Sequence, residues 1–520
     1  MNLYLSDIFV GLTDAKNELL RGCSSDKDAF LSGFLIPENV SLNEFYRGRR
    51  YYVTGLKGTG KTALLRYLSM KVEEEQQAST LFILFKSEFT EEDRAKLSHT
   101  ADIFSKSSDF SSQFKDYERV WIWFLFQRIV KICEERGVQL YEDNADWKQF
   151  RRKVLAAMDS SNQMASIFPK VKQGKIEVST KLLTVHIDFE PSEETSKERA
   201  KIDFVSLVSQ CEELFKKLRP SRDKLYLFID ELELSLGAKK KYQRDIELIR
   251  DMILAVYKLN SLSRENQTGL YCIAALRREV HSATMSAGKE INKPVSDFGI
   301  TLRWHQARDY TTDHPLIKII LQRLRYAELS LPEADRAHDD ESLWLRYFPE
   351  KINEKTSQEF ILNRTWFRPR DIVRLLSIAQ QQFPSENKFS QRILENVNKE
   401  FSTESWTEQV EELQTRYSLS EIDGIKHIVM GLRCPFILSD IIRKADQTKQ
   451  LYQEVDNLLS NHKLGSILED LYSLGIIGNT GEKNMRYAFR GDDGLLLENP
   501  MTIHPALWNV LSASRANAGY

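Results

Sequence analysis

Residues 50–70 constrain this chain more than any other segment, because they combine a β-rich run, a glycine-rich turn and an apolar helical period. The turn reads GLKGTGKT at residues 55–62 and matches the phosphate-binding pattern G-x-x-x-x-G-K-[S/T] in the strand, loop and helix context that the pattern requires. Its glycines let backbone N–H groups converge on a phosphate, and the following helix adds partial positive charge at its start. The sequence therefore predicts a nucleotide phosphate site.

The residue types in this turn suit ATP held together with Mg²⁺. Lys61 can reach the β- and γ-phosphates, and the hydroxyl of Thr62 can ligate a Mg²⁺ ion that keeps most of its waters. We therefore expect ATP and Mg²⁺ as cofactors. The predicted nucleotide contacts are Gly55, Lys57, Gly58, Thr59, Gly60, Lys61 and Thr62.

A second motif supplies the carboxylates that such a site needs. Residues 225–233 read LYLFIDELE, an apolar strand that runs into Asp230 and Glu231. Asp230 at the strand tip would hold Mg²⁺ through its water shell, and Glu231 could accept a proton from the attacking water. The alternative is a buried strand that ends in a solvated acidic turn. The phosphate loop upstream favours the catalytic interpretation.

Three more apolar runs, at residues 80–85, 270–275 and 298–304, alternate with helical segments. The pattern predicts an α/β fold with a parallel five-stranded core flanked by helices. Because the run at 80–85 precedes the Asp-Glu strand, we expect a strand between the two motif strands. This order, with Glu231 after Asp230, resembles the additional-strand division of P-loop ATPases, which includes the AAA+ and STAND proteins.

That resemblance implies two arginines at the nucleotide. In these proteins a polar residue at the tip of the strand after the Asp-Glu strand senses the γ-phosphate, and Arg277 is the candidate here, with Arg278 beside it. An exposed loop arginine is the alternative interpretation. A charged side chain at this tip could stabilise phosphate charge in the transition state.

The second arginine lies in residues 366–376, WFRPRDIVRLL, where Pro369 is placed to begin a helix. The segment resembles the Pro-Arg element of the lid in origin-recognition-type AAA+ and STAND ATPases, which makes Arg370 the candidate second sensor. Arg368 and Arg374 compete for that role, and a basic first turn that pairs with Asp371 is the alternative. Phe367-Arg368 stands where the family usually has Gly-Asn, which leaves the lid geometry open.

The chain is long enough for several domains, at 520 residues. We expect the first part of the ATPase core at 1–89, an inserted α+β region at 90–200, the remainder of the core at 201–310, a helical lid at 311–402 and a winged-helix-like domain at 403–520. The insertion should hold helices at 117–137 and 146–158, a small hairpin or sheet extension at 175–188 and an exposed connection at 191–199.

The C-terminal region carries three helical segments, at 419–432, 436–445 and 464–474, and then short strands. This order resembles the third helix and wing of a winged-helix domain. Its third helix carries Glu469 and Asp470 with Lys463 as the cation, which is an adverse charge for a helix that faces phosphates. We therefore expect a protein-contacting winged helix.

Composition and charge limit the partners, metals and cellular location that we expect for this chain. The formal net charge of −2 gives no global attraction to nucleic acid, so DNA binding would need a local patch such as the basic cluster at 239–244, which a solvated helix face also explains. The longest apolar run, at 120–126, is too short to span a membrane. The cysteines and histidines lack metal-site spacing, and the N-terminus does not resemble a signal peptide. We expect a cytoplasmic protein without a membrane partner and without a metal beyond Mg²⁺.

Taken together, the motifs are similar, over roughly residues 8–380, to a family of orphan bacterial P-loop ATPases that often occur with phage-defence genes. The resemblance implies an ATP-hydrolysing switch that acts on a protein partner or effector, and a role in defence. Two alternatives stay open: a nucleic-acid-dependent ATPase and an ATP-binding scaffold with negligible turnover. The sequence does not distinguish a homo-oligomer from a monomer, and no second catalytic constellation stands out.

Overall fold

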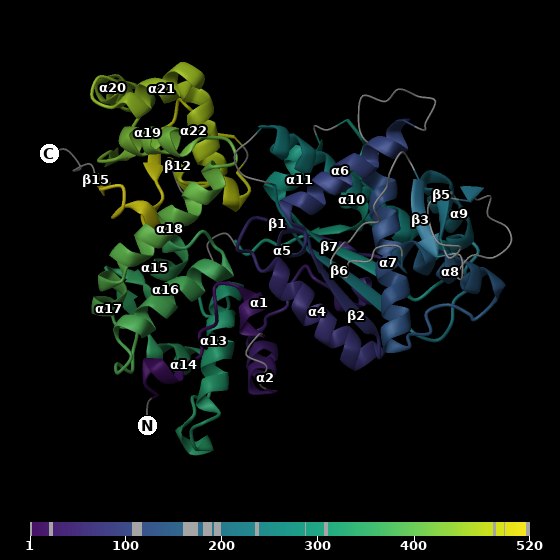
Figure 1. Ribbon diagram of the computed structural model, residues 1–520. Helices are drawn as coiled ribbons and strands as arrows, with labels where there is room; N and C mark the ends of the chain where they lie inside the picture. The colour runs from purple at the N-terminus through teal and green to yellow at the C-terminus, as the bar shows by residue number, and fades with distance from the viewer. Residues whose placement is uncertain are drawn as a thin grey trace. The chain divides into compact units, whose positions relative to one another are not determined.

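The computed structural model describes residues 3–19, 24–106, 117–159, 175–179, 190–191, 199–234, 239–285, 288–305, 310–481, 485–492 and 494–515 (Figure 1). The chain divides into two compact units. We call Glu38–Gly55 with Leu64–Thr301 the sheet unit, and Met1–Pro37 with Leu56–Ala63 and Leu302–Tyr520 the helical unit. Each unit is described by itself.

A five-stranded parallel sheet forms the centre of the sheet unit. Its strands are β1 (Tyr52–Gly55), β2 (Ser79–Leu84), β6 (Leu225–Leu232), β7 (Leu270–Arg277) and β8 (Gly299–Thr301), in the order β2-β6-β7-β1-β8. The predicted α/β fold with a parallel five-stranded core is confirmed. A strand does lie between the two motif strands β1 and β6, and it is β7, whereas β2 lies at the sheet edge.

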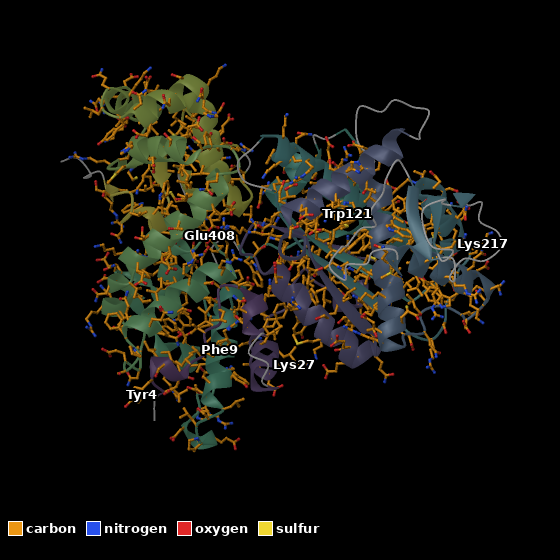
Figure 2. All side chains as sticks on the ribbon, in the orientation of Figure 1. Tyr4, Phe9, Lys27, Trp121, Lys217 and Glu408 are labelled. Atoms are coloured by element: carbon orange, nitrogen blue, oxygen red, sulfur yellow. The ribbon has the colours of Figure 1, made fainter. Side chains whose placement is uncertain are left out.

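Helices cover this sheet and explain why its strands read as apolar runs, since strands of a covered parallel sheet are buried on both faces. They are α4 (Lys61–Gln76), α5 (Phe85–Glu88), α7 (Tyr117–Arg136), α10 (Lys239–Glu265), α11 (Arg278–Met285) and α12 (Asn292–Phe298). Two more helices lie farther from the sheet: α6 (Glu91–Lys106) packs against α7, and α9 (Phe204–Phe215) packs against α8 (Ala145–Asp159). The hydroxyl of Tyr52 donates to the Ile253 carbonyl at 2.7 Å and ties β1 to α10. The Trp121 indole, labelled in Figure 2, donates to the Leu248 carbonyl at 2.8 Å and ties α7 to α10.

The apolar run at 120–126 lies within α7, where every one of its side chains is buried. The helix predicted at 117–137 is therefore part of the core of the sheet unit. None of the helices in the described ranges has both the length and the apolar character that crossing a bilayer requires.

The described residues between α7 and α9 form a helix and a second, antiparallel sheet. The helix is α8 (Ala145–Asp159), and the strands are β3 (Lys175–Ser179), β4 (Glu190–Pro191) and β5 (Arg199–Asp203), in the order β3-β5-β4. β3 pairs with β5, so the strand predicted at the start of 175–188 is present with a more distant partner than a local hairpin. Residues 180–189 and 192–198, which include most of the predicted connection, lie outside the described residues.

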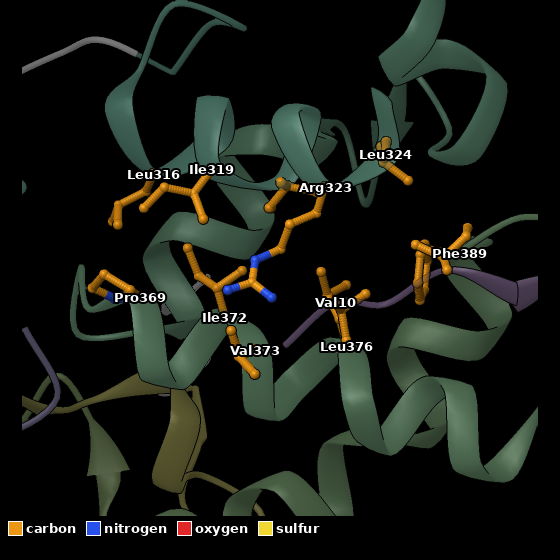
Figure 3. A pocket seen from close by; sticks show the side chains of 12 residues that line it. Val10, Leu316, Ile319, Arg323, Leu324, Pro369, Ile372, Val373, Leu376 and Phe389 are labelled. Carbon is orange, nitrogen blue, oxygen red and sulfur yellow. The ribbon is translucent and has the colours of Figure 1, made fainter. Parts of the chain in front are cut away.

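The first part of the helical unit is built from helices around the N-terminal segment. The elements are η1 (Leu5–Asp7), α1 (Ala15–Glu18), α2 (Ser24–Gly33), α13 (Pro315–Glu328), α14 (Asp340–Tyr347), α15 (Ser357–Arg364), α16 (Pro369–Gln382), α17 (Gln391–Asn396) and α18 (Asn398–Leu413). Val10 lies among apolar side chains of α13 and α16, such as Leu316 and Leu376, around a cavity of about 10 Å³ (Figure 3). This packing holds the N-terminal segment to the lid helices.

The C-terminal part of the helical unit has the predicted winged-helix-like pattern of helices followed by short strands. It contains α19 (Leu419–Val429), α20 (Leu438–Lys449), α21 (Gln453–Asn461), α22 (Leu464–Ser473) and a sheet in the order β13 (Met485–Arg486), β12 (Ile477–Thr480), β14 (Met501–Ile503). The helix α21 was not predicted. The Trp366 indole donates to the Gly475 carbonyl at 2.8 Å and joins this part to the lid.

Candidate functional site

The glycine-rich turn connects β1, which ends at Gly55, to α4, which begins at Lys61. Gly58 and Gly60 have φ of +80° and +89°, a backbone conformation that glycine adopts without steric cost. The Lys61 ammonium and the Thr59 hydroxyl both donate to the Leu56 carbonyl, at 2.7 and 2.8 Å. The polar side chains of the turn therefore form hydrogen bonds within the turn itself.

Lys57, a predicted nucleotide contact, is held by acidic side chains of α18 within the helical unit. Its ammonium lies 3.0 Å from Glu411, 3.6 Å from Glu408 and 3.9 Å from Glu412. The Lys57 side chain is only 11% exposed, so these carboxylates are its immediate electrostatic environment. Figure 2 labels Glu408, the most buried of the three acids.

The lid arginines lie beside the same turn. Pro369 opens α16 as predicted, and the Arg370 backbone N–H lies 3.4 Å from the Gly58 carbonyl. The Arg370 guanidinium pairs with Glu408 at 3.0 Å and donates to the Thr13 carbonyl at 2.9 Å. Arg374 also pairs with Glu408. The structure thus brings Arg370 to the glycine-rich turn, with its charge engaged by an acid of α18.

Arg368 differs from these two arginines. It is 5% exposed, and it forms no ion pair with any residue that the structure describes. Its Nε has no hydrogen-bond partner there. Its Cδ lies 3.4 Å from the position that a Cβ on Gly58 would occupy. A buried guanidinium that forms no ion pair with a described carboxylate therefore lies against the predicted phosphate loop.

In this cluster, the pKa values of two carboxyl groups are shifted in opposite directions. Burial disfavours the charged form of Glu408, yet the charges of Arg374, Arg370 and Lys57 outweigh it and hold its pKa far below the usual range. Burial raises the pKa of Asp371 despite the nearby arginines. Glu408 is thus the ionised centre of the cluster. The alternative interpretation, a basic first turn that pairs with Asp371, is represented by Arg374, whose guanidinium lies 3.5 Å from the Asp371 carboxylate.

In the sheet unit, Asp230 and Glu231 lie at the carboxyl end of β6, where the pairing with β7 shifts register between Ile229 and Leu232. Asp230 is 5% exposed and accepts from the Glu231 backbone N–H at 2.8 Å. Glu231 has φ of +58°, which costs a non-glycine residue about 1 kcal/mol or more. Such strain persists where the surrounding structure fixes a side chain in place.

Ser87, in α5, holds the Glu231 carboxylate. Its backbone N–H donates to Glu231 Oε2 at 3.0 Å, and its hydroxyl donates to the same oxygen. The predicted sensor Arg277 ends β7, and its guanidinium pairs with Glu233, which also pairs with Lys86 at 2.9 Å. Asp230, Glu231 and Arg277 therefore lie at the carboxyl ends of neighbouring strands.

The basic cluster at the start of α10 is engaged by acids where the structure describes it. Arg244 pairs with Glu91 at 2.6 Å and with Asp245 at 2.8 Å, and Lys241 lies 3.7 Å from Glu91. The side chain of Lys239 lies outside the described residues. These ion pairs favour the interpretation of a solvated helix face.

The residues present suit Mg²⁺ and a nucleotide. At Gly60 no described atom lies within 4 Å of the position of a Cβ, so the turn has open space for a ligand. Thr62 lies in the first turn of α4, and its hydroxyl is an oxygen ligand of the type that Mg²⁺ prefers. In the sheet unit, the Asp230 carboxylate is of the same type. Among the described residues, no group of three or more His, Cys, Asp or Glu side chains is placed so that it could hold a metal ion.

Several residues of the candidate site were missed from the sequence: Glu408, Ser87, Glu233 and Trp304. The Trp304 indole donates to the Thr59 carbonyl at 2.9 Å and so stabilises the backbone of the turn. Glu408 is distant in sequence from the turn that it contacts, so no local spacing could have identified it. Ser87 offered one signal, since it follows the end of a predicted strand whose neighbour carries the Asp-Glu pair.

Comparisons with known proteins add two findings. Residues 315–408 match the model of a family described as the FunZ-associated C-terminal helical domain, a segment that includes the lid arginines and Glu408. The chain is also similar to the crystal structure of Cdc6p from Pyrobaculum aerophilum, at 13% identity over 88% of this chain and 93% of that one, with a TM-score of 0.32. No curated protein matches the chain.

Proposed function

We propose that this chain binds ATP with Mg²⁺ at the glycine-rich turn, hydrolyses it and uses the cycle to switch a protein partner. The observation that carries the proposal is the turn itself, with two glycines at positive φ between a buried parallel strand and a helix that begins at Lys61. Backbone N–H groups in such a turn, together with the helix start, form an anion site.

The proposal gives each predicted residue a role. Lys61 contacts the β- and γ-phosphates, Thr62 and Asp230 hold Mg²⁺ with its waters, and Glu231 accepts a proton from the attacking water. The strained backbone of Glu231 and its two hydrogen bonds from Ser87 support a fixed position for that carboxylate. Arg277 is proposed to contact the γ-phosphate after exchanging its pairing with Glu233.

Among the lid arginines, the pairing pattern favours Arg368, one of the two competing candidates, beside Arg370. Both arginines lie against Gly58, but Arg370 would have to leave Glu408 to reach a phosphate, whereas Arg368 forms no ion pair with an acid in the described residues. A buried cation is stabilised by an anion, and a nucleotide phosphate is an anion that this turn would hold.

The switch follows from competition for Lys57. Its ammonium is shared by three carboxylates of α18, and a phosphate bound in the turn offers it a stronger partner. Nucleotide binding would therefore loosen α18 from the turn, and loss of the γ-phosphate would restore the contact. The partner is proposed to be a protein, because the negative charge of Asp470 on α22 would repel nucleic-acid phosphates. Arg416 and Tyr417 donate hydrogen bonds to the Asp470 carboxylate. A role in phage defence rests on the sequence resemblance alone.

ATP turnover by the purified full chain tests the proposal. We expect wild type to hydrolyse ATP with Mg²⁺, and Lys61→Ala and Glu231→Gln to lower kcat by about 100-fold or more. Lys71→Ala is the matched control, because this lysine lies on the same helix α4 in surface ion pairs with Glu74 and Glu75. Loss of turnover in the control as well would contradict the assignment.

Two further outcomes decide between the alternatives. Stimulation of turnover by double-stranded DNA would favour a nucleic-acid-dependent ATPase over the protein switch. Saturable ATP binding without turnover, with and without DNA, would favour the scaffold. Absence of ATP binding to wild type would refute the proposal as a whole.

A further inference from the structure

A second cavity lies within the helical unit, and none of the site residues discussed above lines it. It has a volume of about 720 Å³, and its walls come from α15, the start of α18 and the strands and 3-10 turns of the C-terminal part. Pockets for small ligands usually have volumes of about 300–1,000 Å³. The cavity is therefore large enough for a compact organic ligand.

The lining is positively charged. It holds Lys355, Arg364, Arg490 and Arg515 but a single carboxylate, Glu359, which pairs with Lys355 at 2.6 Å. Among the residues that the structure describes, no carboxylate lies within ion-pair distance of Arg364 or Arg490. The arginines of the lid, by contrast, share Glu408. The cavity thus has more cationic than anionic side chains, and Arg364 and Arg490 form no ion pair with a described carboxylate.

The hydrogen bonds of the two central arginines leave part of each guanidinium available. Arg364 donates to Asn398 Oδ1 at 2.8 Å, and Arg490 donates to the Met485 carbonyl and to Asn363 Oδ1, both at 3.1 Å. The Nε of Arg490 is buried without a hydrogen-bond partner. Burial lowers the pKa of Arg364 to about 10, although the carboxylate of Glu395 acts against this at longer range.

Tyr487 gives a second, independent sign of a missing ligand. Its side chain lines the cavity and is 2% exposed, and its hydroxyl forms no hydrogen bond in the described structure. Buried polar atoms without a partner are rare in folded proteins and often mark an absent water or ligand. Tyr310 and Trp508 add aromatic surface, and the Trp508 indole N–H is already bound by the Ile503 carbonyl at 2.8 Å.

We propose that this cavity binds a nucleoside monophosphate, with the phosphate at Arg364, Arg490 and the Tyr487 hydroxyl. Guanidinium groups match phosphate oxygens with paired, charge-assisted hydrogen bonds. The base would contact the aromatic side chains of the lining, Tyr310 and Trp508. The site is separate from the glycine-rich turn, and its function does not depend on ATP hydrolysis there.

Equilibrium dialysis of the full chain with labelled AMP and GMP tests the proposal. A monophosphate lacks the β- and γ-phosphates that a P-loop reads, so Lys61→Ala should leave its Kd unchanged. We expect Arg490→Gln and Arg364→Gln each to weaken binding by about 10- to 100-fold. Arg443→Gln is the matched control, because its side chain is 69% exposed and pairs only with Asp440 on the same helix among the described residues.

Tyr487→Phe covers the case in which an arginine variant fails to fold, since it keeps the buried ring and removes one hydroxyl. We expect it to weaken AMP or GMP binding by about 3- to 10-fold with an unchanged thermal midpoint. The proposal is overturned if neither monophosphate binds, if Lys61→Ala removes the binding, or if the cavity variants leave Kd unchanged. Binding of a single-stranded oligonucleotide but of neither monophosphate would overturn the ligand class.

Discussion

The replacement Glu408→Ala tests whether the charge cluster at the lid is a single electrostatic unit. The Glu408 side chain is 9% exposed and pairs with Arg370 at 3.0 Å, with Lys57 at 3.6 Å and with Arg374. Removing it leaves three cations close together, of which Arg374 is nearly as buried as Glu408 was. The loss of one partner from a buried ion pair usually costs about 3–5 kcal/mol. We expect a loss of unfolding free energy in that range.

Glu411→Ala provides the matched control. Glu411 lies on the same helix and pairs with the same lysine at 3.0 Å, but its side chain is 61% exposed. An exposed ion pair contributes about 0–1 kcal/mol, so this variant should unfold close to wild type. Urea unfolding followed by tryptophan fluorescence would measure both midpoints, with Trp406 of α18 as a nearby reporter that is 7% exposed. Equal midpoints for the two variants would refute the reasoning, because burial would then not matter.

Three further predictions concern other parts of the candidate site. Ser87→Ala removes a hydroxyl donor to Glu231, so steady-state kinetics should show kcat lower by about 3- to 10-fold with KM for ATP unchanged; an unchanged kcat would contradict a positioning role. Gly58→Ala should cost about 1–2 kcal/mol in thermal unfolding, because φ is +80° and the new Cβ would lie 3.3 Å from a lid arginine; Gly60→Ala, with open space, should cost less. The lowered pKa of Glu408 contributes stability that is fully present above the unfolded pKa of about 4.3 and is lost as the pH falls towards the much lower folded pKa; in urea unfolding, the stability difference between wild type and Glu408→Ala should therefore begin to shrink near pH 5 and should still be partly present at about pH 3.

The glycine-rich turn and the Asp-Glu strand could be identified from the sequence because each is a pattern of adjacent residues. The glycines of the turn and the apolar run into Asp230 are short patterns whose geometry follows from adjacent residues. The parallel core followed as well, since covered strands must be apolar on both faces. The order of the strands was less accessible: nothing in the run at 270–275 marks it as the strand that separates β1 from β6.

The electrostatic environment of the site could not be predicted in this way. Arg370 is the predicted second sensor, and its partner in the structure, Glu408, lies on another helix, with no local spacing that connects the two. The positive φ of Glu231 likewise depends on the register shift between β6 and β7. Both features come from tertiary packing that overrides what a sequence window contains, and both lie at the candidate site, where local rules are most often broken.

The competition for Lys57 makes one prediction that separates the switch from a static ATP site. The carboxylates that hold Lys57 lie in the C-terminal half of α18, so a phosphate that captures the lysine removes their counter-charge. The negative charges of Glu408, Glu411 and Glu412 then repel one another more strongly. The backbone hydrogen bonds at this end of the helix should therefore open more often.

Hydrogen exchange read by mass spectrometry would detect the change. With a non-hydrolysable ATP analogue, amide exchange at residues 406–413 should rise while exchange at the start of α4 falls, because the nucleotide protects the glycine-rich turn. Lys61→Ala with the same analogue is the control and should show neither change. Protection of the turn without any change in α18 would mean that ATP binds and the lid does not respond, which would leave the ATPase intact and remove the physical basis of the switch.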